Sequence, residues 1–198
     1  METNVYLFLG GPGCGKSSVC YYLKEIYGFE HISVGSLFRR EIKTGSVLGK
    51  IIKNSIKKGI IVDSDISLSL LEKELEKFKG KSIMIDGYPR DMNNYNKWND
   101  FLKNNPQYKE NIIFYLDTKP ENMFDRVLCR NNENDNRRLD DDEKIVKKRI
   151  NTFFEESKIV VEIIEINKKD KLVKINGNNE KDRVLVDIIK VFRQNNIK

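Results

Sequence analysis

The chain has 198 residues, of which 39% are hydrophobic and 33% charged, and its formal net charge is +6. This length and composition are typical of one soluble globular domain, here spanning residues 1–198. No apolar run approaches the ~18 residues that span a bilayer, and the N-terminus lacks the basic segment and cleavage site of a signal peptide. We therefore expect no membrane partner and a cytoplasmic location, with the nucleus as the alternative.

Neither the cysteines nor the positive charge identifies a partner. Cys14, Cys20 and Cys129 are odd in number and lack CxxC spacing, which argues against a disulfide framework and against a zinc site. The chain has no alanine, whereas lysine, asparagine and isoleucine are plentiful, as expected from an AT-rich coding genome. The charge therefore fits either a solvated lysine-rich surface or an anionic partner.

Strand-like and helix-like segments alternate along the chain. Residues 5–9 form a short apolar run before a glycine-rich loop, and residues 17–27 look helical, with Gly28 able to end the helix. Helix-like segments with glycine breaks fill residues 31–80. Further strands are predicted at 82–86, 111–117 and 171–177, and further helices at 120–130 and 182–192. This alternation predicts an α/β fold with a central parallel sheet flanked by helices.

The glycine-rich loop carries the first functional motif. Residues 10–17, GGPGCGKS, satisfy G-x-x-x-x-G-K-[ST] between a predicted strand and a predicted helix, which is the context that this motif requires. Its backbone N–H groups and the helix N-terminus can surround a phosphate, and Lys16 can reach the terminal phosphates. We predict a nucleoside triphosphate site that includes Gly11, Pro12, Gly13, Cys14, Gly15, Lys16, Ser17 and Ser18. The loop uses its backbone, so we assign no chemistry to the Cys14 thiol.

Three further stretches follow in order: HISVGSLFRRE (31–41), IDGYPRDMNNYNKW (85–98) and RVLCR…RRLDDDEKIVKKRI (126–150). Together with the loop they make the chain resemble the nucleoside monophosphate kinases of the adenylate and UMP–CMP kinase family, over nearly its whole length. The resemblance implies a P-loop NTPase fold with a helical monophosphate-binding insert at 31–65 and a lid at 130–143. That lid is short and lacks cysteine, which places the chain nearest the short-lid UMP–CMP kinases.

In such enzymes a phosphoryl group passes from Mg²⁺-bound ATP to a nucleotide that is already an anion. Catalysis is therefore positioning and charge neutralisation, and no protein base is needed. By resemblance the expected catalytic cations are Lys16, Arg90, Arg126, Arg138 and Arg149. Arg130 resembles the lid arginine that covers the adenine of ATP. Asp86, at the end of a predicted strand, resembles the carboxylate that holds Mg²⁺ through water.

The resemblance also implies where the monophosphate binds. Arg39 and Arg90 would hold it, and Arg138 and Arg149 would close over the phosphates being transferred. The full expected set is Ser33, Gly35, Arg39, Ile60, Val62, Gly87, Arg90, Asn94, Arg138 and Arg149. We interpret Asp140 and Asp141 as lid and hinge residues, with Asp140 and Glu143 also placed like a helix capping box. His31, the single histidine, is interpreted as a packing residue at a strand end.

Three positions depart from the family's pattern. The loop reads G-K-S-S where G-K-G-T is usual, so Ser18 can replace the threonine hydroxyl while Ser17 adds a side chain beside the phosphates. Ser36 stands where an acidic residue is usual, and Arg137 where a glycine is usual.

Two positions favour a pyrimidine nucleotide as the acceptor. Asn94 matches UMP–CMP kinases where adenylate kinases of this type carry glutamine, and Val34 lacks the hydroxyl of the adenine-type pocket. We therefore expect a monomeric UMP/CMP kinase in pyrimidine nucleotide biosynthesis, with dCMP as a further candidate substrate. AMP is the alternative acceptor, and an inactive nucleotide-binding scaffold is the alternative of another class. A nucleic-acid binder is disfavoured because the basic clusters lack interleaved aromatic residues.

Overall fold

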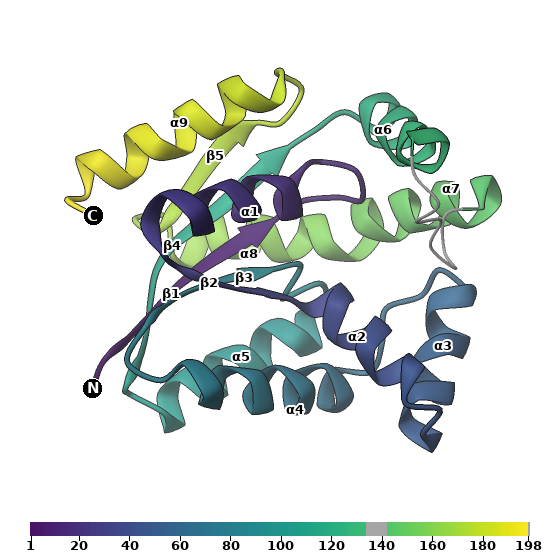
Figure 1. The fold of residues 1–198 in the computed structure, drawn as a ribbon, viewed down its shortest axis with the longest axis horizontal. Coiled ribbons are helices and arrows are strands. Elements are labelled where there is room, and N and C mark those ends of the chain that lie inside the picture. The colour runs from purple at the N-terminus through teal and green to yellow at the C-terminus, as the bar shows by residue number, and fades with distance from the viewer. Residues whose placement is uncertain (134–141, 198) are drawn as a thin grey trace.

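The structure is a computed structural model that describes residues 1–133 and 142–197, without the side chains of residues 130–133. Five strands form one sheet in the order β2-β3-β1-β4-β5, and every neighbouring pair is parallel (Figure 1). The strands are β1 (Thr3–Leu9), β2 (Glu30–Ser33), β3 (Ser82–Asp86), β4 (Tyr108–Asp117) and β5 (Leu172–Asn176). The predicted α/β fold with a parallel sheet is therefore confirmed.

Helices cover both faces of this sheet. Their bounds are α1 (Lys16–Tyr27), α2 (Val34–Lys43), α3 (Val47–Lys57), α4 (Ser64–Leu75), α5 (Met92–Asn104), α6 (Pro120–Glu133), α7 (Glu143–Thr152), α8 (Lys158–Asn167) and α9 (Lys181–Gln194), with a 3₁₀ turn at Glu76–Phe78 and a π-helical segment at Phe153–Ser157. Side chains alternate along β1, so that Tyr6 and Phe8 pack with α1 and α9 while Val5, Leu7 and Leu9 pack on the opposite face. Burial on both faces explains why β1 reads as a continuous apolar run.

Most of the predicted elements are confirmed with small shifts at their ends. The strand predicted at 82–86 has those bounds, and the helix predicted at 17–27 begins one residue earlier. Gly28 ends that helix in a left-handed conformation, φ 68°, and its N–H donates to the carbonyl of Lys24 at 2.8 Å. Among the described residues, no helix combines the length and the apolar character that crossing a membrane requires.

Two predictions of local structure are wrong. Strand β2 falls inside a region that was predicted as helix with glycine breaks, because Ile32 is its only buried residue and α2 follows it directly. His31 lies within this strand. The capping box of Asp140 and Glu143 is also wrong: α7 begins at Glu143 and is capped by Asp142, whose carboxylate accepts from the Lys144 N–H at 3.1 Å. Asp140 itself lies outside the described residues.

The carboxyl ends of the strands all face one side of the molecule. Figure 1 shows α2 and α3 beyond that edge on one side and α6 and α7 on the other, with the loop between β1 and α1 between them. The predicted insert at 31–65 contains α2 and α3. The predicted lid at 130–143 lies largely outside the described residues, so that the division into insert and lid stays a prediction.

Candidate active site

The loop between β1 and α1 is pressed against α6. Gly13 and Gly15 have left-handed backbone conformations, with φ of 74° and 97°. A Cβ atom at Gly13 would lie 2.4 Å from the carbonyl oxygen of Met123, and one at Gly11 would lie 2.4 Å from the Met123 sulfur. Gly11 and Gly13 are therefore needed for close packing on α6, a reason that the sequence alone did not show, whereas Gly15 is needed only for its left-handed turn.

Lys16 folds back over this loop. Its Nζ donates to the carbonyl oxygens of Gly10 and Gly11 at 2.7 and 2.9 Å, and lies 3.2 Å from the sulfur of Cys14. The ammonium group is thus held where the loop's own carbonyls neutralise part of its charge. Lys16 is the first residue of α1, and its service to a phosphate bound by the loop stays a prediction.

Asp86 ends β3 next to the loop and is only 4% exposed. Its Oδ2 accepts a hydrogen bond from Ser17 Oγ at 2.5 Å and lies 3.6 Å from His31 Nε2. Burial by itself would raise the pKa of Asp86, but His31, the charge of Lys16 and the Ser17 hydroxyl lower it to about 2. The carboxylate is therefore charged at neutral pH. His31 Nε2 is buried and has no hydrogen-bond partner among the described residues.

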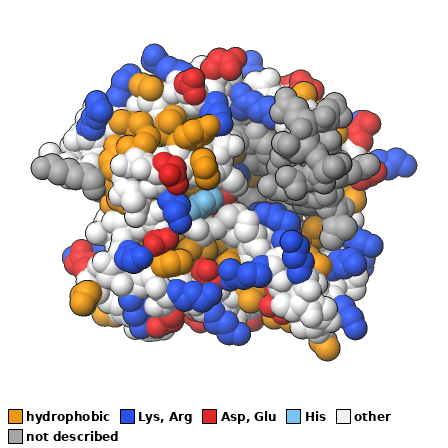
Figure 2. Space-filling view, viewed as in Figure 1, with side chains coloured by type: hydrophobic (Ala, Val, Ile, Leu, Met, Phe, Trp, Pro, Cys, Tyr) orange, Lys and Arg blue, Asp and Glu red, His pale blue; other side chains and the backbone are white. Residues whose placement is uncertain are grey.

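A cleft of about 1100 Å³ runs along this edge of the sheet. The face is hollowed across its middle, with lysine and arginine side chains along the rim (Figure 2). Most of the predicted site residues line the cleft: Pro12, Gly13, Cys14, Gly15, Lys16, Ser17, Ser18, Ser33, Gly35, Arg39, Ile60, Val62, Asp86, Gly87, Arg90, Arg126 and Arg149. The structure therefore brings together residues from widely separated stretches of the sequence.

The arginines that line the cleft come from different elements. Arg39 on α2 donates to Ser36 Oγ at 2.7 Å, and Arg90 donates through Nε to the carbonyl of Gly87 at 2.9 Å. Arg149 reaches the cleft from α7. Arg126 on α6 donates to the carbonyl of Gly177 at 2.6 Å, which fastens α6 to the loop after β5. Arginine side chains therefore line the cleft from three sides: Arg39 from α2, Arg90 from the loop after β3 and Arg149 from α7.

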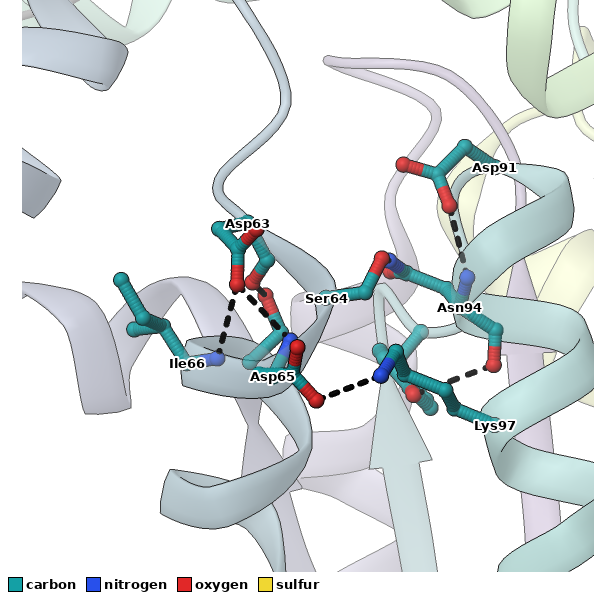
Figure 3. Close-up of polar contacts among 9 residues, drawn as sticks. Asp63, Ser64, Asp65, Ile66, Asp91, Asn94 and Lys97 are labelled. Carbon is teal, nitrogen blue, oxygen red and sulfur yellow. Dashed lines mark hydrogen bonds and ion pairs between the residues drawn. The ribbon is translucent and has the colours of Figure 1, made fainter.

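Asn94 does not line this cleft. It is 1% exposed, its Nδ2 donates to Ser64 Oγ at 2.7 Å, and its Oδ1 accepts from the Arg90 N–H at 3.3 Å. Figure 3 shows Asn94 and Ser64 at the junction of α4 and α5, where Lys97 also pairs with Asp65. The carboxamide is therefore fixed in one orientation beneath Arg90. Gly11, also predicted for the site, is buried against Met123 instead of lining the cleft.

Sequence reasoning missed two groups of residues at the site. Ser64, the partner of Asn94, has no motif that marks it. Asn179, Glu180 and Lys181, after β5, line the cleft beside the P-loop helix. The stretch GNNE after a predicted strand was the available signal, because ligands in open α/β folds bind at the carboxyl ends of strands.

Several predicted residues cannot be placed in this description. The side chains of Arg130, Arg137, Arg138, Asp140 and Asp141 lie outside the described residues. Their roles in the lid stay predictions that rest on the family resemblance.

The oxygen atoms of Asp86, at the end of β3, and of Ser17, at the start of α1, suit Mg²⁺. Asp86 and Ser17 offer hard oxygen atoms, and Mg²⁺ in proteins usually takes one or two carboxylates together with waters and substrate phosphates. Among the side chains that the structure describes, no group of three or more His, Cys, Asp or Glu gathers to hold a metal. The chemistry of this pair therefore fits a metal that arrives with a phosphate ligand.

A parallel sheet with a phosphate loop and a basic cleft at its carboxyl edge is the architecture of a P-loop NTPase fold. The family model described as "Adenylate kinase" matches residues 8–169. UMP-CMP kinase 3 of Oryza sativa subsp. japonica is 35% identical over 191 residues, covering 96% of this chain and 86% of the rice protein. UMP-CMP kinase of Rattus norvegicus is 33% identical over 198 residues, covering 97% and 98%. The chain belongs to the adenylate kinase family and is a nucleoside monophosphate kinase.

Proposed function

We propose that this enzyme transfers the γ-phosphoryl group of Mg²⁺-bound ATP to UMP or CMP, with dCMP as a further substrate. The observation that carries the choice of base is the carboxamide of Asn94, held in one orientation by Ser64 and by the Arg90 backbone. A second N–H on Nδ2 and a second lone pair on Oδ1 remain for a base edge. The relatives named UMP-CMP kinase, which match nearly the whole chain, support the same choice.

The base would bind at the insert end of the cleft. Ile60 and Val62 line the cleft there, and Val62 lies two residues before Ser64, the partner of Asn94. Asn94 is buried in the described structure, so base contact requires residues 60–62 to shift as the insert closes over the nucleotide, while Ser64 keeps its bond to Asn94. A base that leaves these buried groups unpaired is strongly disfavoured.

The phosphates would bind between the loop and the arginines. In this proposal Lys16 moves from the carbonyls of Gly10 and Gly11 to the phosphates of ATP, while Arg39 and Arg90 hold the monophosphate. Arg149, with Arg138 from the lid, neutralises the phosphoryl group as it is transferred. Asp86 would hold, through water, the Mg²⁺ that accompanies ATP, and this ion would neutralise charge on the β- and γ-phosphates.

Closure of the insert and the lid would exclude water, which otherwise accepts the phosphoryl group. In the proposal this closure involves residues 31–65 and 130–143, with Arg130 covering the adenine and with Asp140 and Asp141 at the hinge. The arrangement of cations from four elements supports an active enzyme over an inactive scaffold, because a scaffold has no need of charge neutralisation at a transfer point.

A coupled assay of ADP release tests this proposal directly. With Mg²⁺ and ATP, the acceptors compared are UMP, CMP, dCMP, AMP and GMP. We expect kcat/KM for UMP and CMP to exceed that for AMP by about tenfold or more, the discrimination of one to two buried hydrogen bonds. AMP as the best acceptor would contradict the proposal that the acceptor is a pyrimidine nucleotide. No turnover with any acceptor would contradict nucleoside monophosphate kinase activity.

A further inference from the structure

Ser17 is the residue that the family resemblance leaves unexplained. It follows the P-loop lysine at a position where the family usually has glycine, and it is the second residue of α1. Its hydroxyl lies 2.5 Å from Asp86 Oδ2, a contact between residues 69 positions apart in the chain. The hydroxyl group thus lies between the phosphate loop and the carboxylate at the end of β3.

The direction of this hydrogen bond leaves Ser17 Oγ available as an electron donor. A serine hydroxyl has one hydrogen and two lone pairs, whereas an ionised carboxylate can only accept. In this bond the Ser17 hydroxyl is the donor and Asp86 Oδ2 is the acceptor. Both lone pairs of Ser17 Oγ are then directed away from the carboxylate. The charged acceptor also strengthens the bond and polarises the hydroxyl oxygen.

Helix capping does not account for the serine. The N-cap of α1 is Gly15, and no side chain caps the helix there. Ser17 Oγ is instead committed to Asp86, and both residues line the cleft beside Lys16. A hydroxyl directly after the P-loop lysine is the position from which a serine or threonine reaches Mg²⁺ in P-loop NTPases.

We propose that Ser17 Oγ is a direct ligand of the Mg²⁺ bound with ATP, and that Asp86 orients this ligand through their hydrogen bond. The proposal rests on the ATP-dependent function above and goes further, because the family's glycine at this position leaves Mg²⁺ to water, with a carboxylate behind it. One protein oxygen would replace one water in the metal's shell. Ser17 is then a binding residue for the metal, and Asp86 is its positioning residue.

Metal affinity, measured apart from turnover, tests the proposal. Mn²⁺ binding to the protein saturated with a non-hydrolysable ATP analogue is followed by electron paramagnetic resonance for wild type, Ser17→Ala and Ser17→Gly. We expect Mn²⁺ affinity to fall about 10-fold in both variants, the lower end of losses from metal sites. Analogue affinity in EDTA should stay within about twofold. Ser69→Ala, which removes an exposed hydroxyl on α4 away from the cleft, is the control and should retain the wild-type metal affinity.

The outcomes separate this proposal from the proposed function. Wild-type protein that gains no Mn²⁺ affinity from the ATP analogue would contradict metal-dependent ATP binding as a whole. Wild type that gains it, with variants of Ser17 that bind Mn²⁺ equally well, would overturn only the role of Ser17. In that second case Ser17 merely ties α1 to β3, and the variants would show a lower free energy of unfolding with unchanged metal affinity.

A cysteine at the same position gives a spectroscopic readout. Thiolates prefer soft metals, so Ser17→Cys should bind Cd²⁺ with the ultraviolet charge-transfer absorption of a cadmium–thiolate bond when the analogue is present. Wild type controls for the thiols of Cys14, Cys20 and Cys129, and Ser69→Cys controls for an added surface thiol; neither should show such an analogue-dependent band. Absence of the band in folded Ser17→Cys would overturn the proposal.

Discussion

Asn94 and Ser64 are joined by a hydrogen bond of 2.7 Å between Nδ2 and Oγ, and the two residues are 1% and 7% exposed (Figure 3). This bond connects α5, which follows the sheet-edge arginine Arg90, to the first residue of α4, which lies at the end of the predicted insert. The orientation of the proposed base-reading amide therefore depends on a residue outside every motif of the family.

Ser64→Ala should alter base selection. The change leaves Asn94 Nδ2 without its acceptor, so the carboxamide can rotate, and we expect kcat/KM for UMP to fall about tenfold with a loss of stability of about 1 kcal/mol. The comparison is with Ser67→Ala on the same helix, whose hydroxyl donates to the Asp63 carbonyl at 2.9 Å. Ser67→Ala should leave the UMP-to-AMP ratio within about twofold. An unchanged ratio in Ser64→Ala would remove Ser64 from the specificity determinants.

Arg90→Ala and Arg138→Ala should each lower kcat by about 10²–10³-fold, the usual loss of a transition-state charge partner, with little change in stability. Steady-state kinetics with CMP, together with urea unfolding, measure both effects. Arg40→Ala is the control for Arg90, because the Arg40 side chain is 61% exposed on α2 and pairs with Glu74 at the surface. Turnover close to wild type in Arg90→Ala would exclude that arginine from the catalytic set.

Lowering the pH should remove the contribution of the Asp86 carboxylate to the free energy of unfolding. Its pKa is lowered from the ordinary 3.8 to about 2, although burial alone would raise it, because His31, Lys16 and Ser17 favour the charged form. The carboxylate loses its proton more readily in the folded chain, so its contribution is complete above pH 3.8 and is lost as the pH falls through about 2. This difference corresponds to about 2 kcal/mol.

Urea unfolding of wild type and Asp86→Asn between about pH 5 and pH 2 measures that contribution. We expect the free energy of unfolding of wild type to decrease more steeply across this range than that of the variant. Equal slopes in the two proteins would show that the pKa of Asp86 is not lowered by folding.

The carboxylate of Glu110, near the start of β4 and away from the cleft, should contribute to the free energy of unfolding. Its buried carboxylate accepts from Trp98 Nε1 and from Lys168 Nζ, both at 2.6 Å. Glu110→Ala leaves both donors without this acceptor, and we expect the free energy of unfolding to fall by about 3 kcal/mol, as for other broken buried ion pairs. Glu165→Ala, which breaks a half-exposed pair with Lys174, should cost less than about 1 kcal/mol. Equal costs in urea unfolding would contradict this assignment.

The sheet could be predicted where apolar runs end in glycine or proline. Strands β1 and β3 are buried on both faces, so continuous hydrophobicity marks them, and the P-loop motif predicts the loop and the helix after β1. Strand β2 could not be found in this way because it lies at the sheet edge with one buried residue. The start of α7 was misplaced because three consecutive aspartates offer equivalent caps, and local sequence does not choose among them.

The site could be predicted as a set of residues but not as a set of contacts. Motif order located the loop, Asp86 and the described arginines, and all of these line one cleft except Gly11, which is buried beneath it. The bond between Ser17 and Asp86 and the bond between Asn94 and Ser64 join residues 69 and 30 positions apart. Such pairs depend on how β3 and α5 pack against α1 and α4, and no local pattern encodes that packing.

The most direct test of the account is a competition among acceptors for one labelled phosphoryl group. The enzyme is given limiting ATP labelled at the γ-phosphate, Mg²⁺, and equal concentrations of UMP, CMP and AMP, and the first labelled products are separated by anion exchange. ADP formed from the donor carries no label, so labelled ADP reports AMP alone. We predict that labelled UDP and CDP together exceed labelled ADP by about tenfold or more, from discrimination by buried hydrogen bonds. Labelled ADP as the main product would contradict a pyrimidine nucleotide as the acceptor.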